Sequence, residues 1–219
     1  MSKMVKVFGF FGVEKFDIIL YLTKVLEVFK KNVLVIDLAD EKSISSAIPN
    51  SDELPVFNYN SADFISSDES LKYLGDNYDF MFIDFGFNVN HPLVNKCDEI
   101  YFVTNMYINN TYRILDAKLA DDQERFLIIR DVENYKAVPD VICSAFASLS
   151  ITKDTCFKLQ ENADDHYNKL DCMYNDMKSL KAVSEEMITI ILLILSQDFL
   201  EKDLRNAIKK LTSSSSKRR

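Results

Sequence analysis

Residues 9–16 read Gly-Phe-Phe-Gly-Val-Glu-Lys-Phe, and the interpretation of the whole chain starts from this stretch. A phosphate-binding loop has the form G-x-x-x-x-G-K-[ST] between a strand and a helix. Its glycine amides hold the phosphates, its Lys neutralises them, and its hydroxyl ligates magnesium. Gly9, Gly12 and Lys15 fit this form. The same spacing also fits an ordinary strand that runs into a turn, so the surrounding elements must decide between the two.

Two positions of the motif depart from a working loop. Glu14 replaces the last glycine, which adds a Cβ where the loop needs unusual dihedral angles and a carboxylate beside the phosphates. Phe16 replaces the hydroxyl residue and has no oxygen to offer magnesium. Both departures oppose nucleotide binding.

The surrounding elements alternate between short apolar runs and segments of helical periodicity. Runs that are apolar on both faces are typical of parallel strands, and their alternation with helices predicts an α/β fold: a doubly wound, mostly parallel sheet flanked by helices. The expected strands are Val5–Phe10, Val33–Ile36, Asp79–Ile83, Glu99–Thr104 and Arg125–Arg130, and the expected helices are Lys15–Lys30, Tyr107–Ala120 and Val138–Phe146.

Two carboxylates close predicted strands. Asp37 ends the second strand and Asp84 ends the third, and ligands of such sheets bind at the carboxyl ends of the strands. Asp37 and Asp84 should therefore meet Gly9, Gly12 and Lys15 in one crevice. Each residue also has a structural alternative: Lys15 can pair with Glu14, Asp37 or Asp84, and the two aspartates can accept hydrogen bonds from nearby loop amides.

The order of these elements resembles the ParA/MinD family of deviant-Walker P-loop ATPases, which position plasmids, division sites, pili and flagella. Family members read Gly-Lys-Gly-Gly-Val-Gly-Lys-Thr-Thr, then a helix, then a strand that ends Ile-Asp-x-Asp. Here residues 9–17 lead through one helix to Val35-Ile36-Asp37-Leu38-Ala39, and Tyr78–Asp84 resembles the family's Walker B strand. The resemblance covers about residues 4–150.

The same resemblance identifies two further departures. The signature lysine, which in active relatives reaches across a dimer interface to the partner's nucleotide, corresponds to Phe10. The second aspartate of the strand-two motif, which helps to place the attacking water, corresponds to Ala39, with Asp40 one position further on. Positions 10, 14, 16 and 39 thus affect four separate parts of the ATPase site.

These departures predict a pseudo-ATPase with a degenerate Walker A motif, no catalytic residue, no metal and no cofactor. Its vestigial nucleotide site would comprise Gly9, Gly12, Lys15, Asp37 and Asp84. The alternative is a diverged enzyme, an ATPase or a small-molecule kinase, that still binds ATP and magnesium through Lys15, Asp37 and Asp84.

Composition narrows the class of partner. The chain has 219 residues and a net charge of −8, which argues against nucleic acid because a phosphate backbone requires a basic surface. The four scattered cysteines predict free thiols, and His91 and His166 lack metal-ligand spacing. We therefore expect a cytoplasmic, bacterial scaffold that binds a protein, such as a secretion, pilus or partition component. Whether the chain forms a homodimer is left open, because relatives use nucleotide to dimerise.

The pattern becomes helical in the last third of the chain. We expect residues 1–160 to form the α/β domain, with a last strand at Thr155–Leu159. Residues 161–211 would pack on it as helices, Ala163–Met177 and Ser179–Leu211, the latter broken near Ser196, and residues 212–219 would be a disordered basic tail. Leu200, Leu204, Ile208 and Leu211 form one apolar stripe. That stripe fits either a packed terminal helix or a peripheral membrane contact through residues 198–211, which would make the chain a membrane-recruited scaffold.

Aromatic segments offer candidate contact surfaces. Phe57–Phe64 and Met106–Tyr112 combine aromatic and amide side chains, which suits either protein contact or ordinary capping and edge packing. We also expect aromatic rings to crowd the former nucleotide crevice, namely those of Phe10, Phe11, Phe16, Phe85 and Phe87.

Overall fold

The computed structural model describes residues 5–48, 55–67, 77–133, 138–175, 180 and 183–213. Within these residues, eight strands form one sheet in the order β3-β4-β2-β5-β1-β6-β7-β8. All neighbouring strands are parallel except β3 and β4. The predicted fold class is confirmed. The strands are β1 (Lys6–Gly12), β2 (Val33–Asp37), β3 (Phe57–Tyr59), β4 (Ala62–Ile65), β5 (Phe80–Asp84), β6 (Glu99–Thr104), β7 (Glu124–Val132) and β8 (Cys156–Gln160).

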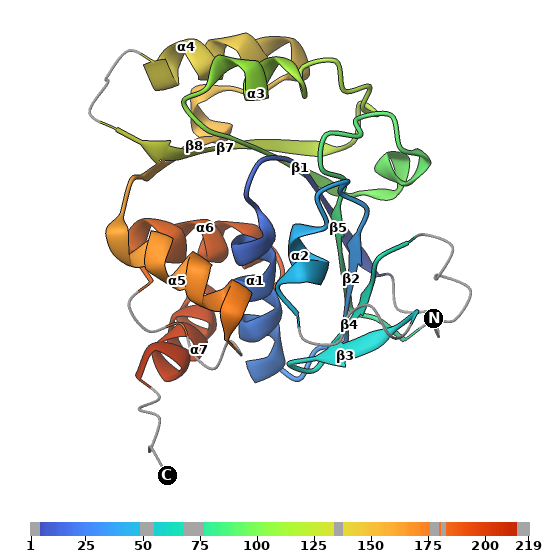
Figure 1. Cartoon of the computed structure of the whole chain (residues 1–219), viewed down its shortest axis with the longest axis vertical. Coiled ribbons are helices and arrows are strands. Elements are labelled where there is room, and N and C mark those ends of the chain that lie inside the picture. The colour runs from blue at the N-terminus through green and yellow to red at the C-terminus, as the bar shows by residue number, and fades with distance from the viewer. Residues whose placement is uncertain are drawn as a thin grey trace.

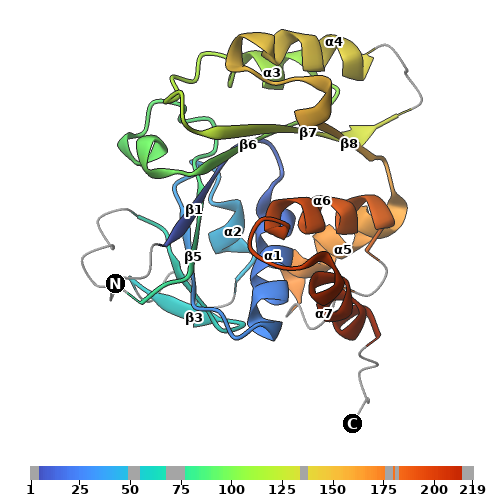
Figure 2. The same ribbon diagram turned by 180° about the vertical axis from the view of Figure 1, so that it is seen from behind.

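Helices cover both faces of the sheet. Figures 1 and 2 show α3 and α4 on one face, and α1, α5, α6 and α7 on the other. The α-helices are α1 (Phe16–Val28), α2 (Ser43–Ser46), α3 (Ile108–Tyr112), α4 (Val138–Ala145), α5 (Ala163–Tyr174), α6 (Glu185–Leu195) and α7 (Glu201–Ser213). Short 3-10 helices lie at η2 (Pro92–Lys96), η3 (Phe146–Leu149) and η4 (Lys153–Thr155).

The central strands are buried on both faces, as parallel strands covered by helices must be. Along β1, Phe8 and Phe10 belong to the core under α1, α6 and α7, whereas Phe11 belongs to the core on the opposite face. The side chains alternate in this way because successive residues of a strand point to opposite faces. The sheet therefore holds the carboxyl end of β1 rigidly between two cores.

The helix predicted at Tyr107–Ala120 is much shorter than expected, because α3 ends at Tyr112. Its sequence, Ile-Asn-Asn-Thr-Tyr, contains β-branched and amide residues of low helix propensity. Asn105 Oδ1 accepts hydrogen bonds from Tyr107 N and Asn110 Nδ2, and such side-chain bonds compete with a helix. The chain leaves the helical path after little more than one turn.

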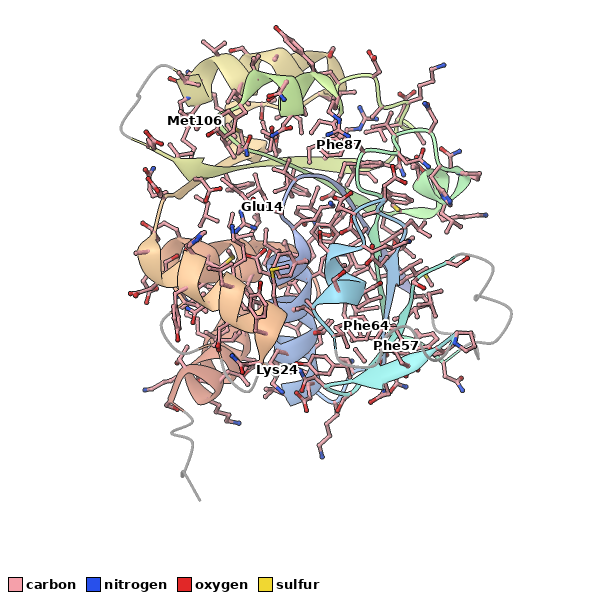
Figure 3. The ribbon with its side chains drawn as sticks, viewed as in Figure 1. Glu14, Lys24, Phe57, Phe64, Phe87 and Met106 are labelled. Atoms are coloured by element: carbon pink, nitrogen blue, oxygen red, sulfur yellow. The ribbon has the colours of Figure 1, made fainter. Side chains whose placement is uncertain are left out.

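The segment Phe57–Phe64 forms a β-hairpin, which the sequence interpretation missed. Its turn residues, Asn60 and Ser61, have φ angles of 49° and 63°, the positive values that a tight hairpin turn requires. The Phe57 and Phe64 rings are buried and stack with centroids 5.5 Å apart (Figure 3). These two rings are core residues and do not form a contact surface.

The C-terminal helices lie against the sheet domain. The chain breaks between α6 and α7 at residues 196–200, close to the predicted position. In α7, Leu204, Ala207 and Ile208 are buried, and Phe199 just before it packs on Phe29 with ring centroids 4.3 Å apart. Among the described residues, no helix is long and apolar enough to cross a bilayer. The disordered tail was expected from residue 212, but α7 continues to Ser213, and residues 214–219 lie outside the described residues.

Candidate functional site

Strand β1 continues through Gly12, the first half of the motif that resembles a phosphate-binding loop. Phe10 pairs with Asp84 of β5 on one side, and Gly12 pairs with Val103 of β6 on the other. The amide of Gly12 donates to Gly86 O over 2.7 Å, and the amide of Val13 donates to Val103 O over 2.9 Å. The amides of Gly12 and Val13, two donors that could face phosphate in a working loop, are therefore used by β6 and by the loop after β5.

Gly12 allows β6 to approach closely. Its φ angle is +100°, and a Cβ added there would lie 1.9 Å from Val103 O. A side chain at this position would collide with the neighbouring backbone. The glycine that the motif would assign to a phosphate cradle is required here by strand pairing.

Lys15 is turned back onto the protein. Its side chain is 2% exposed, and Nζ donates to Gly12 O over 2.7 Å and lies 2.9 Å from Asp84 Oδ1. Of the pairings that the sequence left open for Lys15, the structure contains the one with Asp84. A third oxygen, Glu41 Oε1, lies 3.7 Å from Nζ. The ammonium group is thus compensated by groups of the chain itself.

Asp84 is buried, and one of its carboxylate oxygens has no partner. Oδ1 accepts a hydrogen bond from Gly86 N over 2.8 Å in addition to its pairing with Lys15. Oδ2 has no hydrogen-bond partner in the part of the chain that the structure describes. Burial raises the pKa of the Asp84 carboxyl, Lys15 offsets part of that shift, and Asp37 adds to it.

Asp37 organises the loop that follows β2. Its Oδ2 accepts hydrogen bonds from Ser45 N over 2.9 Å and from Ser45 Oγ over 2.8 Å, and its Oδ1 accepts one from Ala39 N over 3.3 Å. The amide of Ala39 is a loop amide of the kind expected from the sequence, whereas Ser45 belongs to α2 and donates through its hydroxyl as well. Ala39 itself is fully buried and packs beside Gly86, where an added Cβ would lie 3.0 Å from Ala39 Cα.

A buried ion pair holds the start of α1, and sequence reasoning missed it. Arg130 at the end of β7 binds Asp17 through both guanidinium nitrogens, with Nη1–Oδ1 at 2.6 Å and Nη2–Oδ2 at 2.7 Å. Arg130 Nη1 also donates to Glu14 O. The only sequence signal was a cation at the end of the apolar run Leu-Ile-Ile, which did not reveal its partner.

Glu14, at the turn between β1 and α1, reaches a different element. It has a φ angle of 39°, a left-handed value that is unusual for this residue type. Its Oε2 lies 2.5 Å from Nζ of Lys169, which projects from α5 and is 9% exposed. Figure 3 shows Glu14 between α5 and the layer formed by β7 and β8. The residue that replaces a glycine of the motif thus ties the loop to α5.

The aromatic rings expected in the crevice mostly belong to the two cores. Phe10 and Phe16 pack on the α1 side of the sheet, and Phe11 stacks on Phe85 in the opposite core with centroids 4.9 Å apart. Phe87 lies under the Arg113 guanidinium, 3.3 Å from ring centroid to Cζ, a cation–π contact. Phe10, Phe11, Phe16 and Phe85 therefore pack within the cores rather than in a shared crevice.

The remaining candidates behave as ordinary residues. Cys97, Cys143, Cys156 and Cys172 are free thiols, as predicted. His91 Nδ1 accepts a hydrogen bond from Leu93 N over 3.2 Å and so caps η2, while His166 is exposed on α5. Across the described ranges, no group of His, Cys, Asp and Glu side chains could hold a metal ion.

Comparison with solved structures identifies the architecture. A ParA family ATPase from Chlorobium tepidum matches with a TM-score of 0.51 at 15% identity, over 94% of this chain and 99% of that one. The fold is that of the ParA/MinD ATPases. The MinC:MinD complex of Aquifex aeolicus matches with a TM-score of 0.55 at 12% identity, over 98% and 99% of the chains. A pNOB8 ParA bound to nonspecific DNA matches with a TM-score of 0.51 at 12% identity, over 94% and 99%.

The likeness to the ParA/MinD ATPases is one of fold. No protein-family model matches the sequence, and no curated protein matches it either. A magnesium nucleotide is the ligand that this fold implies, and the residues present do not fit it as they are placed. The amides of Gly12 and Val13 are bonded within the protein, Lys15 is paired with Asp84, and Phe16 offers no oxygen to a metal.

Proposed function

We propose that this chain is a pseudo-ATPase of ParA/MinD type, which neither binds nor hydrolyses nucleotide and acts as a protein-binding assembly or localisation factor in the bacterial cytoplasm. One observation carries the proposal. Lys15, the cation that would meet phosphate, is buried against Asp84 and Gly12 O at the end of a strand that is paired on both sides.

Energetics support this proposal. For Lys15 to reach a phosphate, its pair with Asp84 must break, and that carboxylate would be left buried with only the amide of Gly86. Breaking a buried pair in this way costs about 3–5 kcal/mol. Main-chain hydrogen bonds of Gly12 and Val13 would also have to open before their amides could face a ligand. A nucleotide would have to offset both losses.

Protein is the proposed class of partner. Among the fold relatives, one MinD is solved with MinC and one ParA is solved on nonspecific DNA. The net charge of −8 favours the first kind of partner over the second. A component of a secretion, pilus or partition machine would fit. The exposed side chains of Tyr107, Ile108 and Tyr112 at α3, which are 71%, 45% and 63% exposed, provide one candidate contact surface.

A peripheral membrane contact through residues 198–211 receives less support. The apolar face of α7 is already buried, since Leu204 is 0% exposed and Ile208 is 4% exposed. Membrane binding would require α7 to leave the core. Co-sedimentation with anionic vesicles tests this: equal pelleting of the full chain and of a Leu204→Asp variant would argue against insertion of that face.

A second candidate is a diverged ATPase that binds ATP and magnesium through Lys15, Asp37 and Asp84. The unpartnered Oδ2 of Asp84 favours it, because a buried oxygen without a partner can receive a ligand.

Calorimetric titration of the protein with ATP and with ADP, each with magnesium, distinguishes the two candidates. An active ParA serves as positive control. We expect no saturable heat and no thermal shift. Saturable binding that is lost in Lys15→Met would overturn the pseudo-ATPase and establish the second candidate.

A further inference from the structure

Two of the free thiols face each other where α4 packs over β8. Cys143 lies on α4 and is 8% exposed, whereas Cys156 begins β8 and is half-buried. Both belong to the core on the face of the sheet that α4 covers (Figures 1 and 2). Burial and a hydrogen bond with Cys143 raise the pKa of the Cys156 thiol. The two side chains are therefore in direct contact.

An ion pair fixes α4 over β8 beside these thiols. Nζ of Lys158 lies 2.8 Å from Oδ1 of Asp140. Asp140 comes three positions before Cys143, so the two share one side of α4. Lys158 comes two positions after Cys156, so the two project from the same face of β8. Helix and strand are thus joined by two neighbouring contacts, one between charges and one between thiols.

The chain between the two thiols is held to Cys143 as well. Cys143 Sγ donates to Thr152 O over 3.7 Å. Thr152 N donates to Thr155 Oγ1 over 2.9 Å, which caps the short η4, and η4 leads directly into Cys156. The segment that carries Cys156 is therefore anchored to the sulfur of Cys143 shortly before it enters β8.

The other two cysteines contact groups without sulfur. Cys97 Sγ donates to Leu93 O over 3.6 Å. Burial raises the pKa of the Cys172 thiol, and a hydrogen bond with Tyr21 offsets part of that shift. A disulfide needs two sulfurs within bonding reach, so Cys97 and Cys172 serve as controls for the pair on α4 and β8.

We propose that Cys143 and Cys156 form a reversible disulfide, which makes them a site of oxidative modification and attaches α4 covalently to β8. Disulfides of cytoplasmic proteins are usually transient and catalytic or redox-sensing, so in the proposed location the bond would form in response to an oxidant. The inference goes beyond the proposed function and does not depend on whether the chain binds nucleotide.

A peroxide is the class of oxidant that we assign, and its two steps balance. The more exposed sulfur, that of Cys156, attacks hydrogen peroxide as the thiolate. The O–O bond breaks, and the departing hydroxide takes up a proton to give water. Cys143 Sγ then attacks the sulfenic acid on Cys156: the S–S bond forms, the S–O bond breaks, and the Cys143 proton leaves in a second water. The two sulfurs together lose two electrons, which the peroxide gains.

The first step should be slow at neutral pH. Because burial and the contact with Cys143 raise the pKa of Cys156, little of the reactive thiolate is present there. Lys158 opposes this shift and Asp140 adds to it. The thiolate fraction, and with it the rate, should rise about tenfold per pH unit between pH 7 and pH 8. The pair should thus respond to sustained oxidation.

Mass spectrometry of the full chain tests the bond. Reduced protein is treated with hydrogen peroxide and digested with trypsin in the absence of reductant. Trypsin cuts after Lys153, between the two thiols, so the disulfide would join the peptide of residues 137–153 to that of residues 154–158. We expect this linked peptide after oxidation, and we expect dithiothreitol to separate it.

Thermal melts show whether the bond fastens α4 to β8. Peroxide should raise the melting temperature of the wild type by about 5 °C, because a cross-link restricts the unfolded chain. Cys156→Ser should give neither the linked peptide nor this rise. Cys97→Ser and Cys172→Ser are the matched controls, and both should keep the linked peptide and the rise.

Several results would overturn the inference. One is a pair of thiols that stays intact in excess peroxide at pH 9, and another is oxidation of Cys156 to a sulfinic acid without the linked peptide. A bond from Cys143 or Cys156 to a different cysteine would also overturn it. A linked peptide with an unchanged melting temperature would contradict the attachment of α4 to β8. Each of these results leaves the pseudo-ATPase standing, because none involves nucleotide.

Discussion

Nζ of Lys15 lies 2.9 Å from Oδ1 of Asp84, and both side chains are almost fully buried. In the family that the sequence resembles, this lysine meets phosphate and this aspartate ends the Walker B strand. Here each is the other's counter-ion. Several predictions about stability and ligand binding depend on that pairing and on the strand that leads into it.

Removal of the lysine should destabilise the fold. Lys15→Met leaves Asp84 buried without its cation, and we expect a loss of about 3–5 kcal/mol in the free energy of unfolding, measured by urea denaturation. The matched double variant, Lys15→Met with Asp84→Leu, replaces both partners by apolar groups. Its free energy of unfolding should fall much less. A loss below about 1 kcal/mol in the single variant would show that the pair is not buried as described.

Asp84 should make stability depend on pH. Its pKa is raised above the ordinary value of 3.8, chiefly by burial, so the folded protein retains a proton that the unfolded chain has already released. The contribution of this carboxyl to stability is therefore largest below pH 3.8 and falls as the pH rises toward the folded pKa. Asp84→Asn cannot titrate. Its stability relative to wild type should therefore increase with pH across that window, and a difference that is constant from acid to neutral pH would contradict the prediction.

Gly12 should be intolerant of any side chain. Gly12→Ala would place a Cβ 1.9 Å from Val103 O at a φ angle of +100°, so we expect poor expression or a loss of several kcal/mol. Gly9→Ala is the matched control, because its Cβ would meet side-chain atoms, Cys97 Sγ at 2.8 Å and Ile100 Cδ1 at 2.9 Å, which can shift more easily. Equal thermal stability of the two variants would show that β1 does not pair through Gly12.

The Arg130–Asp17 pair should require arginine. A lysine cannot reproduce the two parallel bonds of the guanidinium, so Arg130→Lys should lower the free energy of unfolding by about 2–3 kcal/mol. Arg205→Lys, which alters the exposed pair with Glu201, should change it by less than about 0.5 kcal/mol. Comparable effects from the two substitutions would contradict the burial of Arg130.

Apolar runs predicted the sheet well, because parallel strands buried on both faces leave a clear sequence signal. β6 was located at its exact residues, β2 extends one residue beyond the prediction at its end, and β5 is shifted by one residue at both ends. The β3–β4 hairpin was not predicted, because its turn is Asn60-Ser61 and contains no glycine. α3 was predicted too long because apolar spacing from Tyr107 onward outweighed the weak helix propensity of its amide residues.

The sequence predicted which residues belong to the candidate site better than it predicted how they are arranged. Gly12, Asp37 and Asp84 end β1, β2 and β5, and Lys15 reaches Asp84, whereas Gly9 lies within β1 and pairs with Ile83 and Ile100. The extension of β1 through Gly12 could not be predicted, because two glycines three residues apart suit a loop as well as a strand. The links from Arg130 to Asp17 and from Lys169 to Glu14 join residues more than a hundred positions apart, and no local pattern encodes them.

Repair of the motif tests most directly whether β1 pairing and the Lys15–Asp84 contact close the site. In Glu14→Gly/Phe16→Thr the lost glycine and hydroxyl return, while the pairing of β1 and the contact between Lys15 and Asp84 remain. Calorimetric titration with ATP and magnesium should show no saturable heat for either the wild type or this double variant. Saturable binding by the wild type would contradict the pseudo-ATPase, and binding by the repaired variant alone would show that positions 14 and 16, rather than the strand and the ion pair, close the site.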